Sequence, residues 1–252
     1  MICAAVMPLC RAVFAATVEI GGMTLPTYMF HDPDPVPKTR SDHYPYYRFD
    51  GYEAKSSLRR WKTVTLESDR LKVTVTPEVG GKVWGAVDKR SGVDFIYFNN
   101  VAKFRDISMR GPWSSGGIEF NFGKMGHEPY TSAPVDWCVR TNADRSVSCF
   151  VGGTEWLCRT FWQVEIRLKD GNDGFETRAV WFNASNLPQT YYQWMNGRFS
   201  AATARAISSP ATTGSGTAAS RIRGRAKTGA ISRSIRRTTS PAIMKTTAPC
   251  TS

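Results

Sequence analysis

The 252-residue sequence lacks three features that define common classes of protein. No segment of useful length carries apolar residues at the 3.6-residue period of an amphipathic helix, which excludes helical bundles and α/β folds. No apolar run reaches the roughly 18 residues that a membrane-spanning helix needs, so no membrane span is expected. The cysteines show neither CxxC nor zinc-finger spacing, and HExxH is absent, so neither a metal nor another cofactor is predicted. The six cysteines are Cys3, Cys10, Cys138, Cys149, Cys158 and Cys250.

Acidic residues are missing from the last fifth of the chain. Residues 201–252 contain nine Lys and Arg and no Asp or Glu, whereas residues 1–200 contain 24 basic and 21 acidic residues. Most of the net charge of +12 therefore belongs to the tail, and it does not indicate that the domain binds nucleic acid. The tail also lacks Leu, Val, Phe, Tyr and Trp, and 29 of its 52 residues are Ala, Ser or Thr. Such a composition cannot bury enough apolar surface to fold, and it predicts a disordered basic tail over residues 200–252.

This change of composition falls just after YYQWMN (191–196), where a strand that needs partners has begun. When codons for Thr213–Ala219 are read two bases out of phase, they can encode WIGHGG. Codons for residues 226–251 can likewise encode KDGRDISVYPANNFSGYHENYRSMH, which has the aromatic, acidic and turn residues of a globular domain. The sequence therefore predicts a frameshift near residues 197–205 and an incomplete domain. The alternative is a native basic arm that binds nucleic acid or a membrane surface.

The N-terminal part divides at about residue 23. Residues 1–23 are apolar but lack a basic leading region, and Arg11 interrupts them, so they form either a secretion signal or a first strand. Cysteines placed like small hydrophobic residues favour the cytoplasm over secretion. Residues 24–57 contain five prolines that exclude a helix, and we expect an extended arm on the domain. The aromatic residues that would fix this arm are Tyr28, Phe30, Tyr44, Tyr46 and Tyr47.

Residues 58–199 read as a partial β-sandwich. Short runs of alternating apolar and polar residues are separated by turns rich in Asn, Asp and Gly, as is typical of antiparallel all-β sandwiches. The expected strands are 62–69, 71–78, 80–89, 93–100, two strands within 135–153, 159–170, 175–185 and one that begins at 191.

Two sequence stretches resemble a known superfamily. Pro77, Glu78, Gly80 and Gly81 form a PE-x-GG turn, and a later turn contains Asp88, Lys89, Ser91 and Gly92. This order resembles the opening of galactose mutarotase-like domains. The stretch GPWSSGGIEFNFGKMGH (111–127) resembles the GG-x-E-x-N…H segment of a bacterial family of unknown function that precedes tetratricopeptide repeats in large proteins. The resemblance covers residues 24–197 and implies a β-supersandwich that handles carbohydrate, without specifying a reaction.

The stretch 111–127 contains the candidate site. Gly116 and Gly117 allow positive φ or close approach to a ligand. On the following strand Ile118, Phe120 and Phe122 would face one side, and Glu119 and Asn121 the other. The resemblance implies that Glu119 and His127 form a catalytic acid/base pair and that Asn121 binds substrate. The plainer alternative is that Glu119 and Asn121 are solvated and that His127 caps a turn.

Trp113 and Arg110 complete the candidate site. Trp113 lies in the glycine-rich loop rather than in an alternating strand, so we expect it to stack on a sugar. Arg110 is a candidate to bind an acidic or phosphorylated sugar, or else to form an ordinary ion pair. The other tryptophans of this region are expected in the core: Trp137, Trp156, Trp162 and Trp194. Glu78 is expected to be a turn residue that hydrogen-bonds the backbone rather than an acid catalyst.

Three functions remain open. The chain is a carbohydrate-active enzyme domain, a non-catalytic sugar-binding module of a larger repeat protein, or a carrier of a basic nucleic-acid-binding arm. The first two predict a carbohydrate ligand and no specific nucleic acid. The sequence does not indicate an oligomeric state.

Overall fold

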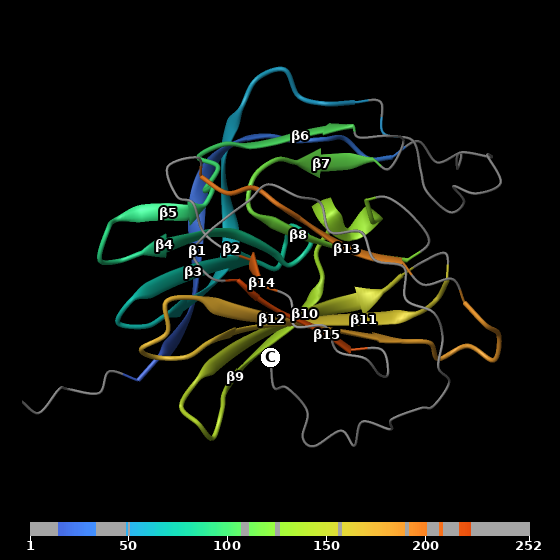
Figure 1. The fold of residues 1–252 in the computed structure, drawn as a ribbon. Helices are drawn as coiled ribbons and strands as arrows, with labels where there is room; N and C mark the ends of the chain where they lie inside the picture. Colours follow the sequence, from blue (N-terminus) through green and yellow to red (C-terminus); the bar gives the residue numbers. More distant parts are fainter. Residues whose placement is uncertain are drawn as a thin grey trace, which may run out of the picture.

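The computed structural model describes residues 15–33, 49, 51–106, 111–123, 127–155, 158–189, 192–200, 207–208 and 217–222. These residues form an all-β, sandwich-like fold of two sheets, as the alternating pattern predicted (Figure 1). The strands are β1 (Thr17–Tyr28), β2 (Ser57–Glu67), β3 (Leu71–Thr76), β4 (Lys82–Asp88), β5 (Val93–Ile96), β6 (Ala102–Asp106), β7 (Pro112–Ser114), β8 (Ile118–Gly123), β9 (Asp136–Thr141), β10 (Val147–Thr154), β11 (Phe161–Leu168), β12 (Phe175–Phe182), β13 (Tyr192–Gly197), β14 (Ile207–Ser208) and β15 (Thr217–Ile222). A short 3₁₀ helix, η1, spans Pro129–Ser132.

The larger sheet has the strand order β13-β8-β4-β3-β2-β1-β6-β7, and β5 pairs with β4 beside this path. The smaller sheet has the order β14-β15-β12-β11-β10-β9 and lies below the larger one in Figure 1. Among the described strands the pairing is antiparallel with one exception, since β1 and β6 are parallel where Thr27 faces Ala102. The sequence predicted antiparallel pairing only. A parallel pair needs a long crossover, and β2 to β5 provide it here.

The first strand crosses the predicted boundary at residue 23. β1 pairs with β2 from Thr17 opposite Glu67 to Thr27 opposite Ser57, so residues 24–28 belong to the sheet and not to an arm. Pro26 is tolerated because β6 pairs only with Thr27 and Tyr28, which leaves β1 an edge strand at the proline. Phe30 packs edge-to-face against Phe49 and Phe104. Tyr44, Tyr46 and Tyr47 lie outside the described residues.

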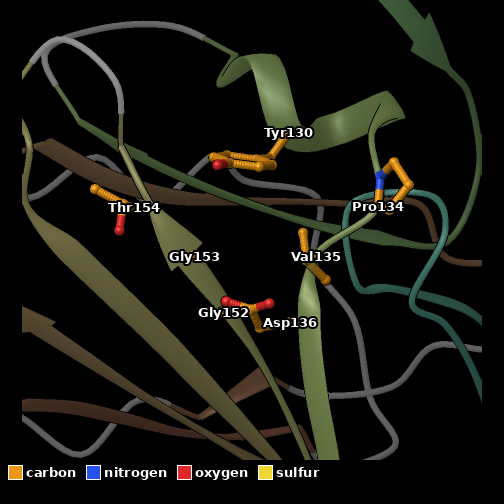
Figure 2. Close-up of a pocket in the computed structure, with 7 residues that line it drawn as sticks. All are labelled: Tyr130, Pro134, Val135, Asp136, Gly152, Gly153 and Thr154. Atoms are coloured by element: carbon orange, nitrogen blue, oxygen red, sulfur yellow. The ribbon is translucent and has the colours of Figure 1, made fainter.

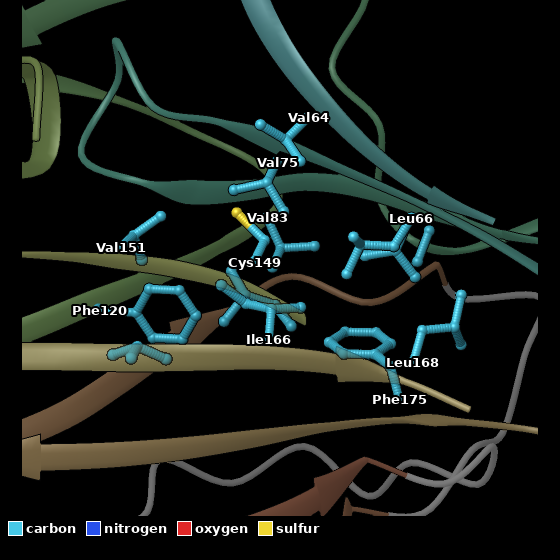
Figure 3. Packing of buried hydrophobic residues seen from close by; sticks show 14 of the residues in the cluster. Val64, Leu66, Val75, Val83, Phe120, Cys149, Val151, Ile166, Leu168 and Phe175 are labelled. Atoms are coloured by element: carbon cyan, nitrogen blue, oxygen red, sulfur yellow. The ribbon is translucent and has the colours of Figure 1, made fainter. Parts of the chain in front are cut away.

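Alternate residues of both sheets fill the space between them, as Figure 3 shows. This main core includes Val73 and Val75 of β3, Phe120 of β8 and the unpaired thiol of Cys149 on β10. The PE-x-GG turn packs against it. Gly81 has φ +64°, and a Cβ at this position would lie 2.6 Å from Cβ of Val151, so only glycine fits.

A second apolar cluster covers the opposite face of the larger sheet. It contains Leu25, Trp61, Val79, Trp84, Ala102 and Phe104. Because both faces of the large sheet are covered, residues on the outward face of β4 and β8 are buried as well. This second layer was not predicted, and it positions the site described below.

Within the span 200–252, for which the sequence predicts disorder, the structure describes two short strands, β14 and β15. β15 pairs with β12 from Thr217 opposite Val180 to Ile222 opposite Phe175, and β14 pairs with β15. The physical reason is that an edge strand such as β12 offers unpaired backbone N–H and C=O groups, which another segment satisfies without needing large apolar side chains. Across the part of the chain that is described, no helix is long and apolar enough to cross a membrane.

Candidate functional site

Strand β8 carries two polar side chains between its core residues. Ile118, Phe120 and Phe122 lie in the main core, so Glu119 and Asn121 project from the other face, as predicted. Both are buried, with 3% and 0% of their surface exposed. The alternative that they are solvated strand residues is therefore wrong, because strands β6 and β7 and their apolar cluster cover this face.

The Glu119 carboxylate accepts three hydrogen bonds from side chains. Nδ2 of Asn121 donates to Oε1 at 2.8 Å, the indole Nε1 of Trp113 donates to Oε2, and Nδ1 of His127 contacts Oε1. Oδ1 of Asn121 in turn accepts from the backbone N–H of Glu128 at 2.9 Å. The structure thus brings together four residues predicted from the sequence. Trp113, Asn121 and His127 all contact the carboxylate of Glu119.

Two indole rings lie against the imidazole of His127. The Trp113 ring is 5.9 Å from it and the Trp194 ring 4.9 Å, both nearly perpendicular to it. Trp194 stands opposite Asn121 in the β13–β8 pairing, so its side chain points to the same face. It is half-buried, whereas the sequence predicted a core residue. The imidazole retains 14% of its surface exposed and the Glu119 side chain 3%, so the histidine is the more accessible partner.

Lys82 of β4 is a component of the site that sequence reasoning missed. It is 2% exposed, and its Nζ donates to the carbonyl oxygen of Ser114 at 2.5 Å. The same Nζ lies 5.8 Å from the ring centres of Trp84 and Trp113. Burial lowers the pKa of Lys82 to about 8, although the charge of Glu119 raises it. The sequence feature that could have indicated a buried Lys82 is its position directly after Gly80–Gly81 in an otherwise apolar strand.

Electrostatics keep Glu119 ionised despite its burial. Removal from water raises the pKa of a carboxyl, but the hydrogen bond from His127, the charges of Lys82 and His127, and the bond from Asn121 outweigh that effect. The net result is a pKa below the ordinary value for glutamate. An ionised carboxylate accepts only, so Nδ1 of His127 must carry the proton in their shared hydrogen bond. This tautomer leaves Nε2 as the atom that can accept a proton.

Gly116 and Gly117 have positive φ values of +86° and +66°, as the sequence indicated. A Cβ on Gly117 would lie 2.3 Å from the carbonyl oxygen of Val83, and one on Gly116 would lie 3.2 Å from the side chains of Tyr97 and Asn99. These close approaches explain both glycines through packing alone. Their predicted role in binding substrate stays a prediction.

The structure places the other predicted residues outside the Glu119 site or leaves them undescribed. Arg110 and Trp156 lie outside the described residues. Trp162 is fully buried in the main core, and Trp137 packs against it, as expected. Glu78 accepts from the backbone N–H of Lys62 at 2.6 Å, so it hydrogen-bonds the backbone, as predicted. In the described ranges, no group of three or more His, Cys, Asp or Glu side chains is arranged to hold a metal ion.

Two buried carboxyl groups, those of Glu128 and Glu155, lie next to the site. Oε1 of Glu128 accepts from Nε1 of Trp162 at 3.1 Å, while its Oε2 has no hydrogen-bond partner in the described structure. Glu155, also fully buried, accepts from the backbone N–H of Cys158 at 2.6 Å. Burial, followed by the charge of Glu155, raises the pKa of Glu128 well above its ordinary value. Glu128 is therefore held as the neutral acid.

The neutral Glu128 gives the fold a dependence on pH. The unfolded chain releases this proton at a pH of about 4.3, whereas the folded chain retains it, so the stabilising effect is complete below that pH and is lost as the pH rises towards the raised pKa. We expect Glu128→Gln, which stays neutral and can still accept from Trp162, to remove this loss of stability between pH 4.5 and pH 8. Urea unfolding of both proteins between pH 4.5 and 8 measures this. Parallel curves for the two proteins over that range would contradict it.

The fold and the site together define an all-β sandwich with a buried carboxylate–imidazole pair on the outer face of its larger sheet. Residues 38–235 match the family described as Domain of unknown function (DUF5107), and the chain belongs to that family. The fold is also similar to that of a solved TPR-domain containing protein from Parabacteroides distasonis ATCC 8503, with a TM-score of 0.69 and 23% identity. The match covers 78% of this chain and 34% of that one, so the chain spans about a third of the length of that protein.

Proposed function

We propose that this chain is a carbohydrate-binding domain whose ligand contacts His127 between the indoles of Trp113 and Trp194. The observation that carries the proposal is the buried Glu119–His127 pair with two indole rings against the imidazole. Indole rings offer flat apolar surfaces that suit the C–H faces of sugars, and the imidazole and indole nitrogens suit their hydroxyl groups. The resemblance of the PE-x-GG turn at Pro77–Gly81 to the opening of galactose mutarotase-like domains supports the same ligand class.

Within this proposal Glu119 and His127 have different roles. Glu119 is almost fully buried and already accepts three hydrogen bonds, so it orients His127 through their shared hydrogen bond. Nε2 of His127 then exchanges a proton with a sugar hydroxyl or the ring oxygen. In this arrangement the Glu119 carboxylate fixes the tautomer of His127, as the aspartate of a catalytic triad does for its histidine.

The larger setting of the domain is part of the proposal. The structural neighbour carries a TPR domain, and this chain corresponds to about a third of its length. We infer that the sandwich is the sugar-handling domain of a larger repeat protein. A non-catalytic module and a mutarotase-like enzyme share this fold, so turnover must separate them.

We expect His127→Ala and Glu119→Gln to remove saccharide binding or turnover. The protein is mixed with reducing monosaccharides and oligosaccharides, while calorimetry follows binding and NMR follows exchange of the anomers. If the domain is catalytic, loss of the proton-transfer group lowers the rate by roughly 10²–10⁴-fold. In that case Glu119→Gln also lowers the rate, because a carboxamide both donates and accepts and no longer fixes the proton of His127 on Nδ1.

A matched control is Glu67→Gln, the same chemical change in a surface ion pair with Lys89. We expect it to leave binding and rate unchanged. Binding without anomer exchange or product release would support the non-catalytic module. If no saccharide binds, or if both site variants bind like the native chain, the proposed function is wrong.

A further inference from the structure

Lys82 and Glu119 are direct neighbours on the outer face of the larger sheet. Val83 of β4 stands opposite Ile118 of β8, and both lie in the main core, so the preceding lysine and the following glutamate project together from the other face. Side chains in such a pair have Cβ atoms about 4.5–5.5 Å apart. Both are almost completely buried, with 2% and 3% of their surface exposed. A buried cation therefore lies beside the buried carboxylate.

The glycine-rich loop holds the lysine in this place. Nζ of Lys82 donates to the carbonyl oxygen of Ser114 at 2.5 Å, and Oγ of the same serine is 3.5 Å away. A Cβ on Gly117 would lie 3.3 Å from Cε of Lys82, so the loop backbone rests against the lysine stem. The Trp113 indole adjoins both charged groups, since its Nε1 donates to Oε2 of Glu119 and its ring centre is 5.8 Å from Nζ.

The positive charge near Glu119 comes from two side chains. Burial raises the pKa of Glu119, and among the described residues the groups that lower it are His127, through a hydrogen bond and its charge, Lys82, through its charge, and Asn121, through a hydrogen bond. His127 shares a proton with the carboxylate, whereas Lys82 does not bond it. Lys82 is therefore the cation that acts on Glu119 through charge alone.

A cavity of about 250 Å³ lies elsewhere, where η1 meets β9 and β10 (Figure 2). Asp136 is the charged residue among those that line it, and it stands opposite Gly152 on the outer face of the smaller sheet. This carboxylate faces away from the Glu119 site, so it does not offset the charge of Lys82.

The number of protons in the Glu119–His127 pair decides what Nε2 of the histidine can do. With one proton, held in the hydrogen bond between Oε1 and Nδ1, Nε2 keeps its lone pair. With two protons, Nε2 carries one of them, whether Glu119 becomes a neutral acid or His127 an imidazolium. A second proton would also leave the ammonium of Lys82 buried without a compensating charge, which is unfavourable away from water.

Burial lowers the pKa of Lys82 to about 8, although the charge of Glu119 raises it, so most of the ammonium keeps its proton at pH 7. We propose that Lys82 is a positioning residue of this site: its charge balances that of Glu119, limits the Glu119–His127 pair to one proton and leaves Nε2 of His127 free to accept another. The charge balance is a property of the free protein. Its use in sugar chemistry rests on the proposed function.

The test records ¹⁵N spectra of the full chain, labelled at histidine, at pH 7 and without saccharide. The chain has three histidines, and His127→Ala identifies the signals of His127. Lys82→Gln removes the charge but can still donate to Ser114, whereas Lys82→Met removes both. We expect the ratio of protonated to unprotonated Nε2 to rise by roughly tenfold or more in both variants, because Glu119 loses a nearby opposite charge. Lys89→Gln, the same change in a surface ion pair, should leave the ratio unchanged.

The native chain offers a second measurement, which does not depend on whether a variant folds. As the pH rises through about 8, Lys82 loses its proton, and the Nδ1–H signal of His127 should move with the same midpoint. Variants of Lys82 that fold should lack this step.

An unchanged Nε2 ratio in both variants, or a change in only one of them, would overturn the proposal, because the charge would then not control the proton. A native chain without a step near pH 8 would overturn it as well. Calorimetry with saccharide judges the proposed function separately. If no sugar binds but the Nε2 ratio responds to Lys82, the proposed function is wrong and the charge balance stands.

Discussion

Trp162→Ala is expected to lower the free energy of unfolding by about 3–5 kcal/mol, the usual range for deleting a fully buried tryptophan or phenylalanine side chain. Domains of this kind are stable by only about 5–15 kcal/mol, so the loss is a large part of the total. The Trp162 side chain is completely buried and stacks on Phe122 of the opposite sheet at 4.9 Å. Its removal opens a cavity between the two sheets and leaves Glu128 without the donor that satisfies Oε1.

Trp162→Phe separates these two effects. Phenylalanine keeps the stack on Phe122 and most of the apolar volume, but it cannot donate to Glu128. We expect it to cost about 1–3 kcal/mol, the usual penalty for an unsatisfied buried polar group. Urea unfolding followed by fluorescence of the remaining tryptophans gives both values. If the alanine and phenylalanine variants are equally stable, packing between the sheets does not depend on this ring.

The strands that were predicted correctly are those whose sequence pattern depends only on residues within the strand itself. In β3, β8, β10 and β11 the apolar residues alternate because one face meets the main core, and a period of two residues needs no knowledge of the partner. The turn between β2 and β3 is equally local. The hydroxyl of Ser68 accepts from the backbone N–H groups of Arg70 and Leu71, which closes the turn whatever the rest of the chain does.

The parts that were not predicted depend on distant segments. Lys82 and Glu119 occupy positions that alternate with core residues, so the pattern places them in solvent. They are buried because Trp113 and Ser114 of β7 lie over them, and β7 has only three residues, too few to show a period. Trp194 looked like a core residue because its strand is aromatic, but its pairing opposite Asn121 directs it to the site.

In the tail, the local amino-acid composition and the pairing with distant strands lead to different expectations. Its composition predicts disorder, yet β15 lies along β12, and the family match extends to residue 235, well past the change of composition. Both observations favour a native segment at least as far as Ile222. Against them stands the out-of-phase reading of the codons, which yields the aromatic, acidic and turn residues of a globular domain.

Sequencing the gene across codons 190–252 is expected to show an open out-of-phase frame that encodes WIGHGG and the globular string that follows. A protein expressed from the restored frame should bury more apolar surface, because aromatic residues replace a segment of Ala, Ser and Thr. We therefore expect a higher midpoint of urea unfolding and a steeper transition, since the slope scales with the surface exposed on unfolding. The chain with the basic tail should associate through unsatisfied sheet edges, and the restored protein should not.

The position of β15 makes the comparison between the two proteins specific. In the chain with the basic tail, β15 pairs with β12 from Thr217 opposite Val180 to Ile222 opposite Phe175. In the restored protein a segment with larger side chains would occupy that edge, and hydrogen exchange of the β12 amides should slow by at least tenfold. An early stop codon in the alternative frame, or β12 amides that exchange at the same rate in both proteins, would show that the basic tail is the native partner of this sheet.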